Sequence, residues 1–168
     1  MKTILALDLG TKTGYCYGNE QNKLKCGTWT LATPREIREW GKLRLTRRCD
    51  PRVQRLYQHI DSLPFKQGIV LFEDVEFASY TKQVQLWASL RGAVWLAFSR
   101  QPDRYLVECV PVGTLKKFAT GAGNADKNGM ARAATRLGYG VNALDDNAID
   151  ALHLWRWGKE NLGRWQGK

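Results

Sequence analysis

Short apolar runs alternate with turn-forming residues along the first third of the chain and predict β-strands. The first run, Ile4-Leu5-Ala6-Leu7, is continuous, which indicates a buried strand. Later runs are rich in aromatic, threonine or cysteine residues, or are again continuous and apolar, and turn formers such as Gly18-Asn19 separate them. The predicted strands cover residues 3–9, 14–18, 24–31, 68–75 and 104–110.

Helical spacing marks other segments. Between residues 81 and 100, apolar side chains recur every three or four positions, which predicts the clearest helix of the chain. Pro34 can open a helix, and Pro51 interrupts the uneven apolar pattern of residues 37–63. Further helices are predicted over 114–119, 128–137 and 145–158. Because no repeat, low-complexity segment or linker divides the chain, we expect a single α/β domain over residues 1–168, long enough for a sizeable core.

The charge of the chain points to nucleic acid as a partner. Lys and Arg number 26 against 16 Asp and Glu, a net charge of +10. Basic side chains displace the counterions condensed on phosphates, so such a surplus favours binding to DNA or RNA. An anionic membrane surface would also attract the charge, but no long apolar span or polybasic tail supports a membrane partner. A basic surface that serves only solubility is the alternative.

The four cysteines, Cys16, Cys26, Cys49 and Cys109, form no CxxC pair, and only two histidines are present, which disfavours a structural zinc site. Their scattered and mostly apolar surroundings predict reduced core cysteines, as in cytosolic proteins. The first apolar run is too short and wrongly flanked for a signal peptide. We therefore expect a cytoplasmic protein.

Asp8 places a carboxylate at the end of the first predicted strand, just before Gly10-Thr11. A charge in a buried strand is costly unless it is paired or binds a metal. The motif resembles both the first phosphate loop of sugar-kinase and actin-like ATPases and the first strand of ribonuclease H-like nucleases. The ATPases need two such domains around a cleft, and this chain has room for one. A capped Asp at a strand end is the structural alternative.

Glu73 ends the fourth predicted strand. Its carboxylate should lie at the same sheet edge as Asp8 if the two strands are neighbours. Because side chains alternate along a strand, Asp74 should point to the opposite face. Only one of these two acids can therefore face a site near Asp8, and a solvated edge acid is the alternative for Glu73.

The last predicted helix adds further acids. Asp146 and Asp150 are four residues apart and share one face, and Asn147 shares it nearly as well. Capping and the helix dipole explain Asp145 at the helix start, but Asp150 lies too deep to gain much from either. Hard cations prefer oxygen ligands, and a pair of Mg²⁺ or Mn²⁺ ions can drive phosphodiester hydrolysis. The candidate ligands for two such ions are Asp8, Glu73, Asp146 and Asp150.

Together these segments resemble the RuvC family of Holliday junction resolvases, within the ribonuclease H-like superfamily. The similarity spans nearly the whole chain, including the order of its five strands. The segments that carry it are Asp8, Glu73, residues 110–117, the loop Gly121-Ala122-Gly123 with Lys127, and Asp150-Ala151-Leu152. The short chain and its acidic ending look most like the bacteriophage branch. The resemblance implies a ribonuclease H-like α/β fold, with a five-stranded mixed sheet flanked by helices.

The resemblance also implies a function. Such a protein is a homodimer that cuts four-way or other branched DNA, leaving 5′-phosphate and 3′-hydroxyl ends, and the helix over residues 81–100 forms the dimer interface in the family. Asp8, Glu73 and Asp150 match family metal ligands. Lys116 and Lys127 match lysines near the scissile phosphate, where a cation stabilises developing charge or orients the attacking water. A phage-encoded protein would act in the cytoplasm of its bacterial host.

Two positions depart from the family pattern. The family commonly places its remaining metal ligand three residues before the last Asp, where this chain has Asn147; either its amide oxygen coordinates or the adjacent Asp146 does, and we favour Asp146. An aromatic wedge commonly follows three residues after the glutamate, where this chain has Glu76. Phe77 and Tyr80 are then the aromatic candidates for contacting bases, with internal packing as the alternative for Phe77.

Basic residues are dense between Arg35 and Arg55, with few acids among them, whereas a solvated face usually mixes signs. This density predicts a surface that follows phosphates without reading sequence. The loop of residues 121–127 lacks the ending of a P-loop and is expected to let the backbone approach DNA, or simply to connect helices. The expected nucleic-acid contacts are Arg44, Arg47, Arg48, Phe77, Tyr80, Lys82, Lys116, Lys117 and Lys127.

Two other functions stay open. A YqgF-like nuclease that acts on RNA shares the start Asp-Leu-Gly-Thr-Lys-Thr, although the Asp150-Ala151-Leu152 ending and the long segment of residues 116–127 argue against it. A module that binds branched DNA without cutting it would also suit the charge, but the acidic residues would then have no role.

Overall fold

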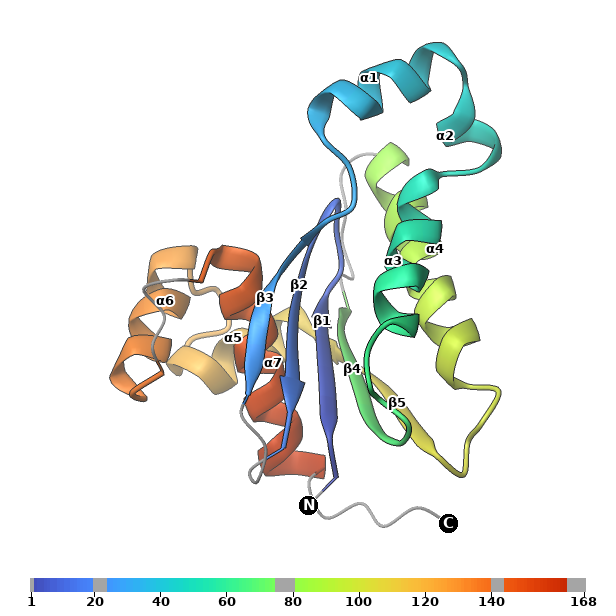
Figure 1. Cartoon of the computed structure of the whole chain (residues 1–168). Helices are drawn as coiled ribbons and strands as arrows, with labels where there is room; N and C mark the ends of the chain where they lie inside the picture. Colours follow the sequence, from blue (N-terminus) through green and yellow to red (C-terminus); the bar gives the residue numbers. More distant parts are fainter. Residues whose placement is uncertain (1, 20–23, 75–80, 140–143, 163–168) are drawn as a thin grey trace.

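A five-stranded sheet between two layers of helices forms the centre of the protein (Figure 1). The structure is a computed structural model that describes residues 2–19, 24–74, 81–139 and 144–162. None of the helices in these ranges is long and apolar enough to cross a membrane. In chain order the elements are β1 (Ile4–Asp8), β2 (Lys12–Gly18), β3 (Lys25–Thr30), α1 (Pro34–Lys42), α2 (Leu45–Arg48), α3 (Pro51–Asp61), β4 (Gly68–Asp74), α4 (Thr81–Phe98), β5 (Tyr105–Pro111), α5 (Val112–Thr120), α6 (Lys127–Arg136) and α7 (Asp146–Leu162).

The predicted strands and helices are all present, with bounds that differ by a few residues. Pro34 and Pro51 each stand at the first position of a helix, where the missing N–H of proline costs nothing. Asp50 caps α3 by accepting a hydrogen bond from the Arg52 N–H at 3.0 Å. The short α2 between these two helices was not predicted.

The sheet has the order β3-β2-β1-β4-β5 and is mixed, as expected. β1 runs antiparallel to β2 and parallel to β4, and β5 is parallel to β4. In the register of β1 and β4, Leu7 lies opposite Phe72. Asp8 and Glu73 each follow one residue later, so they end at the same edge of the sheet.

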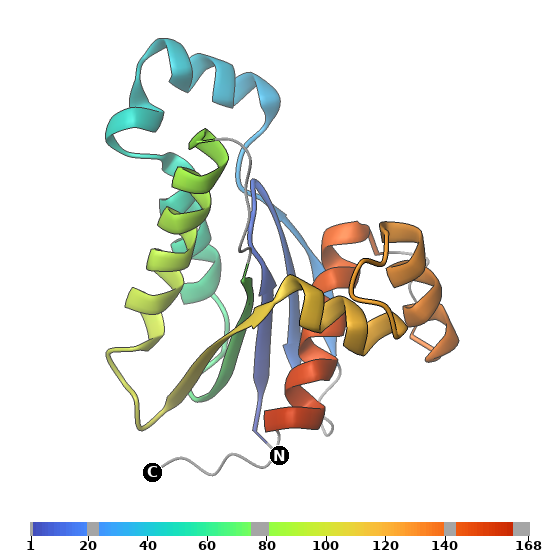
Figure 2. The same ribbon diagram turned by 180° about the vertical axis from the view of Figure 1, so that it is seen from behind.

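Alternation along the strands divides the core into two halves. Ile4, Ala6 and Leu71 pack with apolar residues of α5, α6 and α7 on one face of the sheet. Leu5 and Phe72 pack with α3 and α4 on the other. Figures 1 and 2 show these two helical layers on opposite sides of the strands. By the same alternation, Asp8 and Glu73 belong to the face that α7 covers.

Helix α7 lies unusually close to the sheet, and two glycines permit this. A Cβ atom on Gly14 would collide with the carbonyl oxygen of Asn147, and one on Gly158 would collide with Cδ1 of Leu71. Most residues between Ala148 and Gly158 are buried, because α7 is enclosed by the sheet and by α5 and α6. Asp150 therefore brings a carboxylate into an enclosed stretch of helix.

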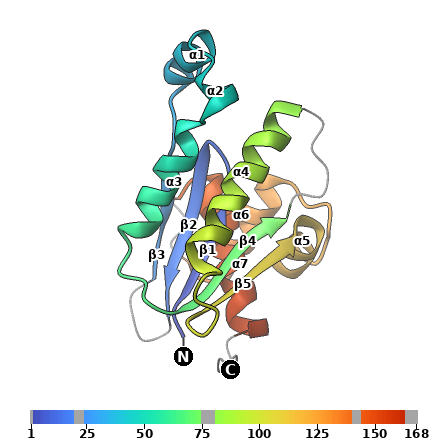
Figure 3. The same ribbon diagram turned by 90° about the vertical axis from the view of Figure 1, so that its right-hand side faces the viewer.

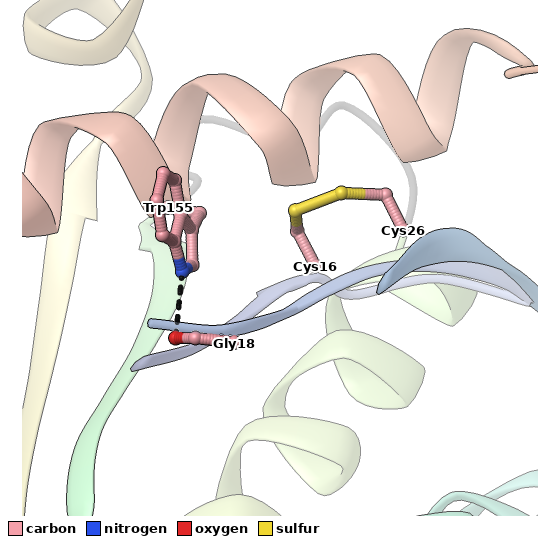
Figure 4. The surroundings of a disulfide bond; sticks show 4 residues. All are labelled: Cys16, Gly18, Cys26 and Trp155. Atoms are coloured by element: carbon pink, nitrogen blue, oxygen red, sulfur yellow. Dashed lines mark hydrogen bonds between the residues drawn. A yellow bond between two sulfur atoms is a disulfide. The ribbon is translucent and has the colours of Figure 1, made fainter. Parts of the chain in front are cut away.

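The prediction of reduced core cysteines is wrong for Cys16 and Cys26. Cys16 and Cys26 lie directly opposite each other in the pairing of β2 with β3 and form a disulfide on the face that α7 covers (Figure 4). Nearby, the Trp155 indole N–H donates to the Gly18 carbonyl at 3.1 Å. Cys49 is a free, exposed thiol and Cys109 a free, half-buried one. Strand register, which brings the paired cysteines together, could not be seen in their spacing.

Candidate active site

Three carboxylates meet at one edge of the sheet, on the face that α7 covers. Asp8 is the last residue of β1 and Glu73 is near the end of β4, while Asp150 is in the second turn of α7. All three side chains are half-buried. Segments far apart in the sequence thus bring together three of the four acids that were predicted from the sequence as metal ligands.

The pKa values of these acids reveal that they interact. Burial, with the charges of Glu73 and Asp150 added, raises the pKa of Asp8 well above its usual range. Burial and the Asp150 charge raise the pKa of Glu73 to about 7. Burial is also the main cause that raises the pKa of Asp150 to about 6. The carboxylates therefore lack sufficient compensation from the protein alone, which is the electrostatic setting that a bound cation would relieve.

Two lysines lie close enough to this carboxylate group for their charges to act on it. Lys116, in α5, lowers the pKa values of Glu73 and Asp150 through its charge. Lys127, the first residue of α6, acts in the same way on Asp8 and Asp150. The two cations come from adjacent helices, and both lie near the acids rather than on a remote surface.

The start of α7 gives its three polar residues different surroundings. Asp145 caps the helix, since its carboxylate accepts a hydrogen bond from the Ala148 N–H at 3.0 Å, as expected for a simple cap. It also accepts a hydrogen bond from the Thr28 hydroxyl. The Asn147 side chain hydrogen-bonds to Asp145 and helps to lower the pKa of that acid against the effect of burial.

Asp146 is linked to the carboxylate group through Lys127 and through its charge. It is exposed, its Oδ2 lies 3.0 Å from Nζ of Lys127, and its charge contributes to the raised pKa of Asp150. Of the two candidates for the remaining metal ligand, Asp146 is thus linked to the other acids, whereas Asn147 is engaged by the helix cap.

The residues fit divalent metal ions by their chemistry. Carboxylate oxygens are the ligands that Mg²⁺ and Mn²⁺ prefer. Among the residues that the structure describes, however, no group of three or more His, Cys, Asp or Glu side chains is arranged closely enough to hold a metal ion. The carboxylates are therefore neighbours that do not yet surround a metal position. Binding of a metal ion would require their side chains to rotate.

Asp74 points away from this group, as strand alternation predicted. Its Oδ1 accepts a hydrogen bond from Nη1 of Arg91 in α4 at 2.8 Å. The Arg91 guanidinium also lies over the rings of Phe72 and Trp87, with its central carbon 5.6 Å from each ring centre. The two adjacent acids of β4 consequently serve opposite faces of the sheet.

The expected nucleic-acid contacts fall in separate places. Lys82, Lys117 and Lys127 are exposed at α4, α5 and α6, while Lys116 is half-buried. The arginines Arg44, Arg47 and Arg48 are exposed on the segment that carries α1 and α2. Phe77 and Tyr80, the aromatic candidates, and Glu76 lie outside the described residues.

Two of the basic residues in the dense segment are paired with acids of the same segment. Arg52 pairs with Asp50, with 2.6 Å between Nη2 and Oδ2, and Arg55 pairs with Glu36, with 2.7 Å between Nη2 and Oε1. Neither arginine is among the expected nucleic-acid contacts, although both contribute to the density of basic residues in this segment. Their acidic partners lie within the same segment, which was the available signal for these pairs.

The residues that hold the start of α7 in place were not predicted from the sequence. Thr28 and Gly14 hold the start of this helix, through the Asp145 carboxylate and the Asn147 backbone. Both partners are more than 100 residues away in the sequence, so no local pattern reveals these contacts.

Comparison with solved structures identifies similar proteins. RuvC of Thermus thermophilus in complex with a Holliday junction substrate has a TM-score of 0.63 and 19% sequence identity, covering 92% of this chain and 91% of that one. A second Thermus thermophilus RuvC structure has a TM-score of 0.64 and 18% identity, with 96% of each chain covered. The yeast mitochondrial Holliday junction resolvase Ydc2 has a TM-score of 0.55 and 13% identity, covering 96% of this chain and 80% of that one.

Neither a protein-family model nor a curated protein sequence matches the chain. At these low identities the similarity concerns the fold. The chain has the ribonuclease H-like fold of the RuvC resolvases, and the predicted fold class is confirmed.

Proposed function

We propose that this protein is a divalent-metal-dependent endonuclease that cuts Holliday junctions and other branched DNA. The observation that carries the proposal is the meeting of Asp8, Glu73 and Asp150 at one sheet edge, with pKa values raised by burial and by one another's charge. Its fold is shared with a RuvC bound to a Holliday junction substrate and with a mitochondrial Holliday junction resolvase, and this fold and the charge of +10 support branched DNA as the substrate.

The acids would hold the metal ions. Asp8, Glu73 and Asp150 offer half-buried oxygens, and Asp146 can add an exposed one. Two bound Mg²⁺ or Mn²⁺ ions would supply an activated water and stabilise the leaving oxygen of a phosphodiester. With the 3′-oxygen as the leaving group, as the family resemblance implies, the products would carry a 5′-phosphate and a 3′-hydroxyl.

The lysines would act on the DNA strand. Lys116 and Lys127 can each place a positive charge beside a phosphate that approaches the carboxylates, where negative charge increases during the reaction. In the free protein Lys127 pairs with Asp146 at 3.0 Å. Because both side chains are exposed, that pair is weak and can exchange for contacts to phosphate and metal.

A homodimer would let two such sites cut opposing strands. Helix α4 supports this part of the proposal because it exposes large apolar side chains, with exposed fractions of 41% for Val84, 37% for Trp95 and 70% for Leu96. A second copy of the chain would cover them, as the family resemblance implies. Bacteriophage origin and cytoplasmic location remain predictions.

The decisive experiment compares Asp8→Asn with the wild type and with Asp103→Asn, which removes the same charge at an exposed site in the turn before β5. Cleavage of four-way, three-way, flap and linear DNA is measured with Mg²⁺ and with Mn²⁺. We expect Asp8→Asn to reduce junction cleavage on the order of 10²- to 10³-fold while junction binding persists. Asp103→Asn should cleave the junction at the wild-type rate. Nicks that can be religated would identify the ends as 5′-phosphate and 3′-hydroxyl.

An unchanged cutting rate in Asp8→Asn would overturn the mechanism. Tight junction binding by the wild type without cleavage in either metal would indicate a binding module instead. Cleavage of RNA hairpins but not of four-way DNA would favour the YqgF-like alternative.

A further inference from the structure

Residues 34–48, which comprise α1, α2 and the turn between them, form an arm beyond the end of the sheet. Figures 1 and 3 show this arm at the end where β1 finishes, and thus at the end that carries Asp8. None of the residues in α1 and α2, all of which the structure describes, is buried. The arm therefore contributes nothing to the core, and its position calls for another explanation.

The arm is strongly basic on its exposed surface. Its two acids are both engaged: Glu36 pairs with Arg55 at 2.7 Å and Glu39 pairs with Lys42 at 3.5 Å. Within the described part of the chain, no side-chain hydrogen bond or ion pair is found for the five exposed arginines of the arm. These are Arg35, Arg38, Arg44, Arg47 and Arg48. Such a cluster of cations repels itself, so an external polyanion is its natural partner.

Arg55 of α3 fixes the N-terminal end of the arm. Its guanidinium donates to the Leu31 carbonyl at 2.8 Å and to Oε1 of Glu36 at 2.7 Å, and it lies over the Trp40 ring at 5.1 Å from the ring centre. Glu36 also completes a capping box with Thr33 at the start of α1. A nine-residue helix is marginal in water by itself, so these contacts account for the helix and its orientation.

Arg52 of α3 fixes the C-terminal end of the arm and links it to the edge of the sheet that carries Asp8. Its guanidinium donates to both oxygens of Asp50, at 2.9 and 2.6 Å, and to the Thr11 hydroxyl at 2.8 Å. Thr11 lies three residues after Asp8, in the turn between β1 and β2. The C-terminal end of the arm is thus attached, through Arg52, to the turn that follows the candidate metal ligand Asp8.

We propose that the arm binds the sugar–phosphate backbone of one duplex segment of the branched DNA, and that Arg55 is the positioning residue that holds the arm for it. The identity of the DNA rests on the proposed function; the attachment of the arm does not. A duplex fits better than a single strand because Trp40, the ring of the arm, is half-buried under Arg55 and offers no open platform for base stacking.

The first test removes charge from the arm. Arg44→Gln/Arg47→Gln/Arg48→Gln is compared with Lys66→Gln/Arg100→Gln/Arg104→Gln, which removes three exposed charges near the opposite end of the sheet, where β4 and β5 begin. Binding to a four-way junction, to linear duplex and to single-stranded DNA is measured in EDTA at several salt concentrations. Removal of one phosphate-binding cation should reduce the slope of log K against log salt by about 0.9, so the slope of the arm variant should fall by about 2.7 and that of the control variant should hardly change.

The second test separates position from charge. Arg55→Gln removes one charge and leaves every cation of the arm in place, yet we expect its slope to fall by clearly more than the value of about 0.9 for one phosphate-binding cation. Arg55→Lys keeps the charge but not the planar fork, and should resemble Arg55→Gln. Thermal unfolding of both variants checks that the rest of the fold is retained.

Equal slopes in the arm variant and its control would overturn the proposal, as would wild-type binding by Arg55→Lys. An arm effect on single-stranded DNA alone would contradict the assignment to a duplex. Because binding is measured without metal, the proposal for the arm can hold even if the wild type proves unable to cut DNA. Conversely, this proposal can fail while cleavage still depends on Asp8.

Discussion

Glu73 and Asp74 are neighbours in β4 that face opposite layers of the protein, since Glu73 interacts with Asp150 of α7 while Asp74 binds Arg91 of α4 at 2.8 Å. Two adjacent residues therefore have different roles: Glu73 is a candidate catalytic acid and Asp74 is a structural one. The two acids provide a matched pair for mutation, because they lie in the same strand and are both half-buried.

For this pair we expect opposite losses. Glu73→Gln should abolish most cleavage, by on the order of 10²- to 10³-fold, with little loss of stability, because it removes a carboxylate that its neighbours repel. Asp74→Asn should instead lower the free energy of unfolding by about 1 to 2 kcal/mol, because Arg91 loses its partner, and should retain cleavage. Junction cleavage and urea unfolding of both variants measure this. Similar cleavage losses in both would show that alternation does not separate their roles.

Asp146 and Asn147 should differ in their effect on the metal requirement. Asp146→Asn removes a charge linked to Asp150, and we expect about 10- to 100-fold more Mg²⁺ to be needed for half-maximal cleavage. Asn147→Ala removes a hydrogen bond to the cap residue Asp145, so it should cost up to about 1 kcal/mol of stability and leave the metal titration unchanged. The reverse pattern in the two titrations would assign the remaining ligand to Asn147.

Gly14 and Gly158 test how closely α7 must approach the sheet. An added methyl at Gly14 meets the backbone of Asn147, which cannot move without shifting the start of α7, so Gly14→Ala should cost about 3 kcal/mol. That corresponds to a fall of about 6 to 12 °C in Tm. At Gly158 the added methyl meets the end of the Leu71 side chain, which can rotate, and about 1 kcal/mol is expected. Calorimetry of the two variants would contradict this view if Gly158→Ala proved the more harmful.

The contacts of Glu36 at the N-terminal end of the arm should stabilise the protein less as the pH falls. Hydrogen bonds from Arg55 and Thr33 lower the pKa of Glu36 from 4.5 to about 2. A lowered folded-state pKa stabilises the protein fully above pH 4.5 and loses that contribution as the pH falls toward 2. The difference in Tm between the wild type and Glu36→Gln should therefore be largest near pH 6 and shrink steadily down to pH 2. A difference that stays constant over this range would show that the Glu36 carboxylate is not held in this way.

Local patterns in the sequence were sufficient for the elements and for part of the site. Continuous apolar runs and helical spacing predicted the strands and the main helices, because burial of one face imposes those periods on any chain. The alternation of side chains along a strand was enough to predict that Glu73 and Asp74 face opposite sides of the sheet. The depth of Asp150 in its helix, beyond the reach of capping, identified it as an acid that needed another explanation.

Only the tertiary structure decided which distant residues meet. The register of β2 with β3 joins Cys16 to Cys26, and the approach of α7 to the sheet brings Thr28 to Asp145 across 117 residues. The arginines of the segment from Arg35 to Arg55 look alike in the sequence, yet Arg52 and Arg55 are bound where the arm joins the rest of the protein, while the five arginines of the arm itself are exposed. Periodicity reports how each segment buries its own apolar face, whereas register, close approach and choice of ion-pair partner depend on how separate segments pack together.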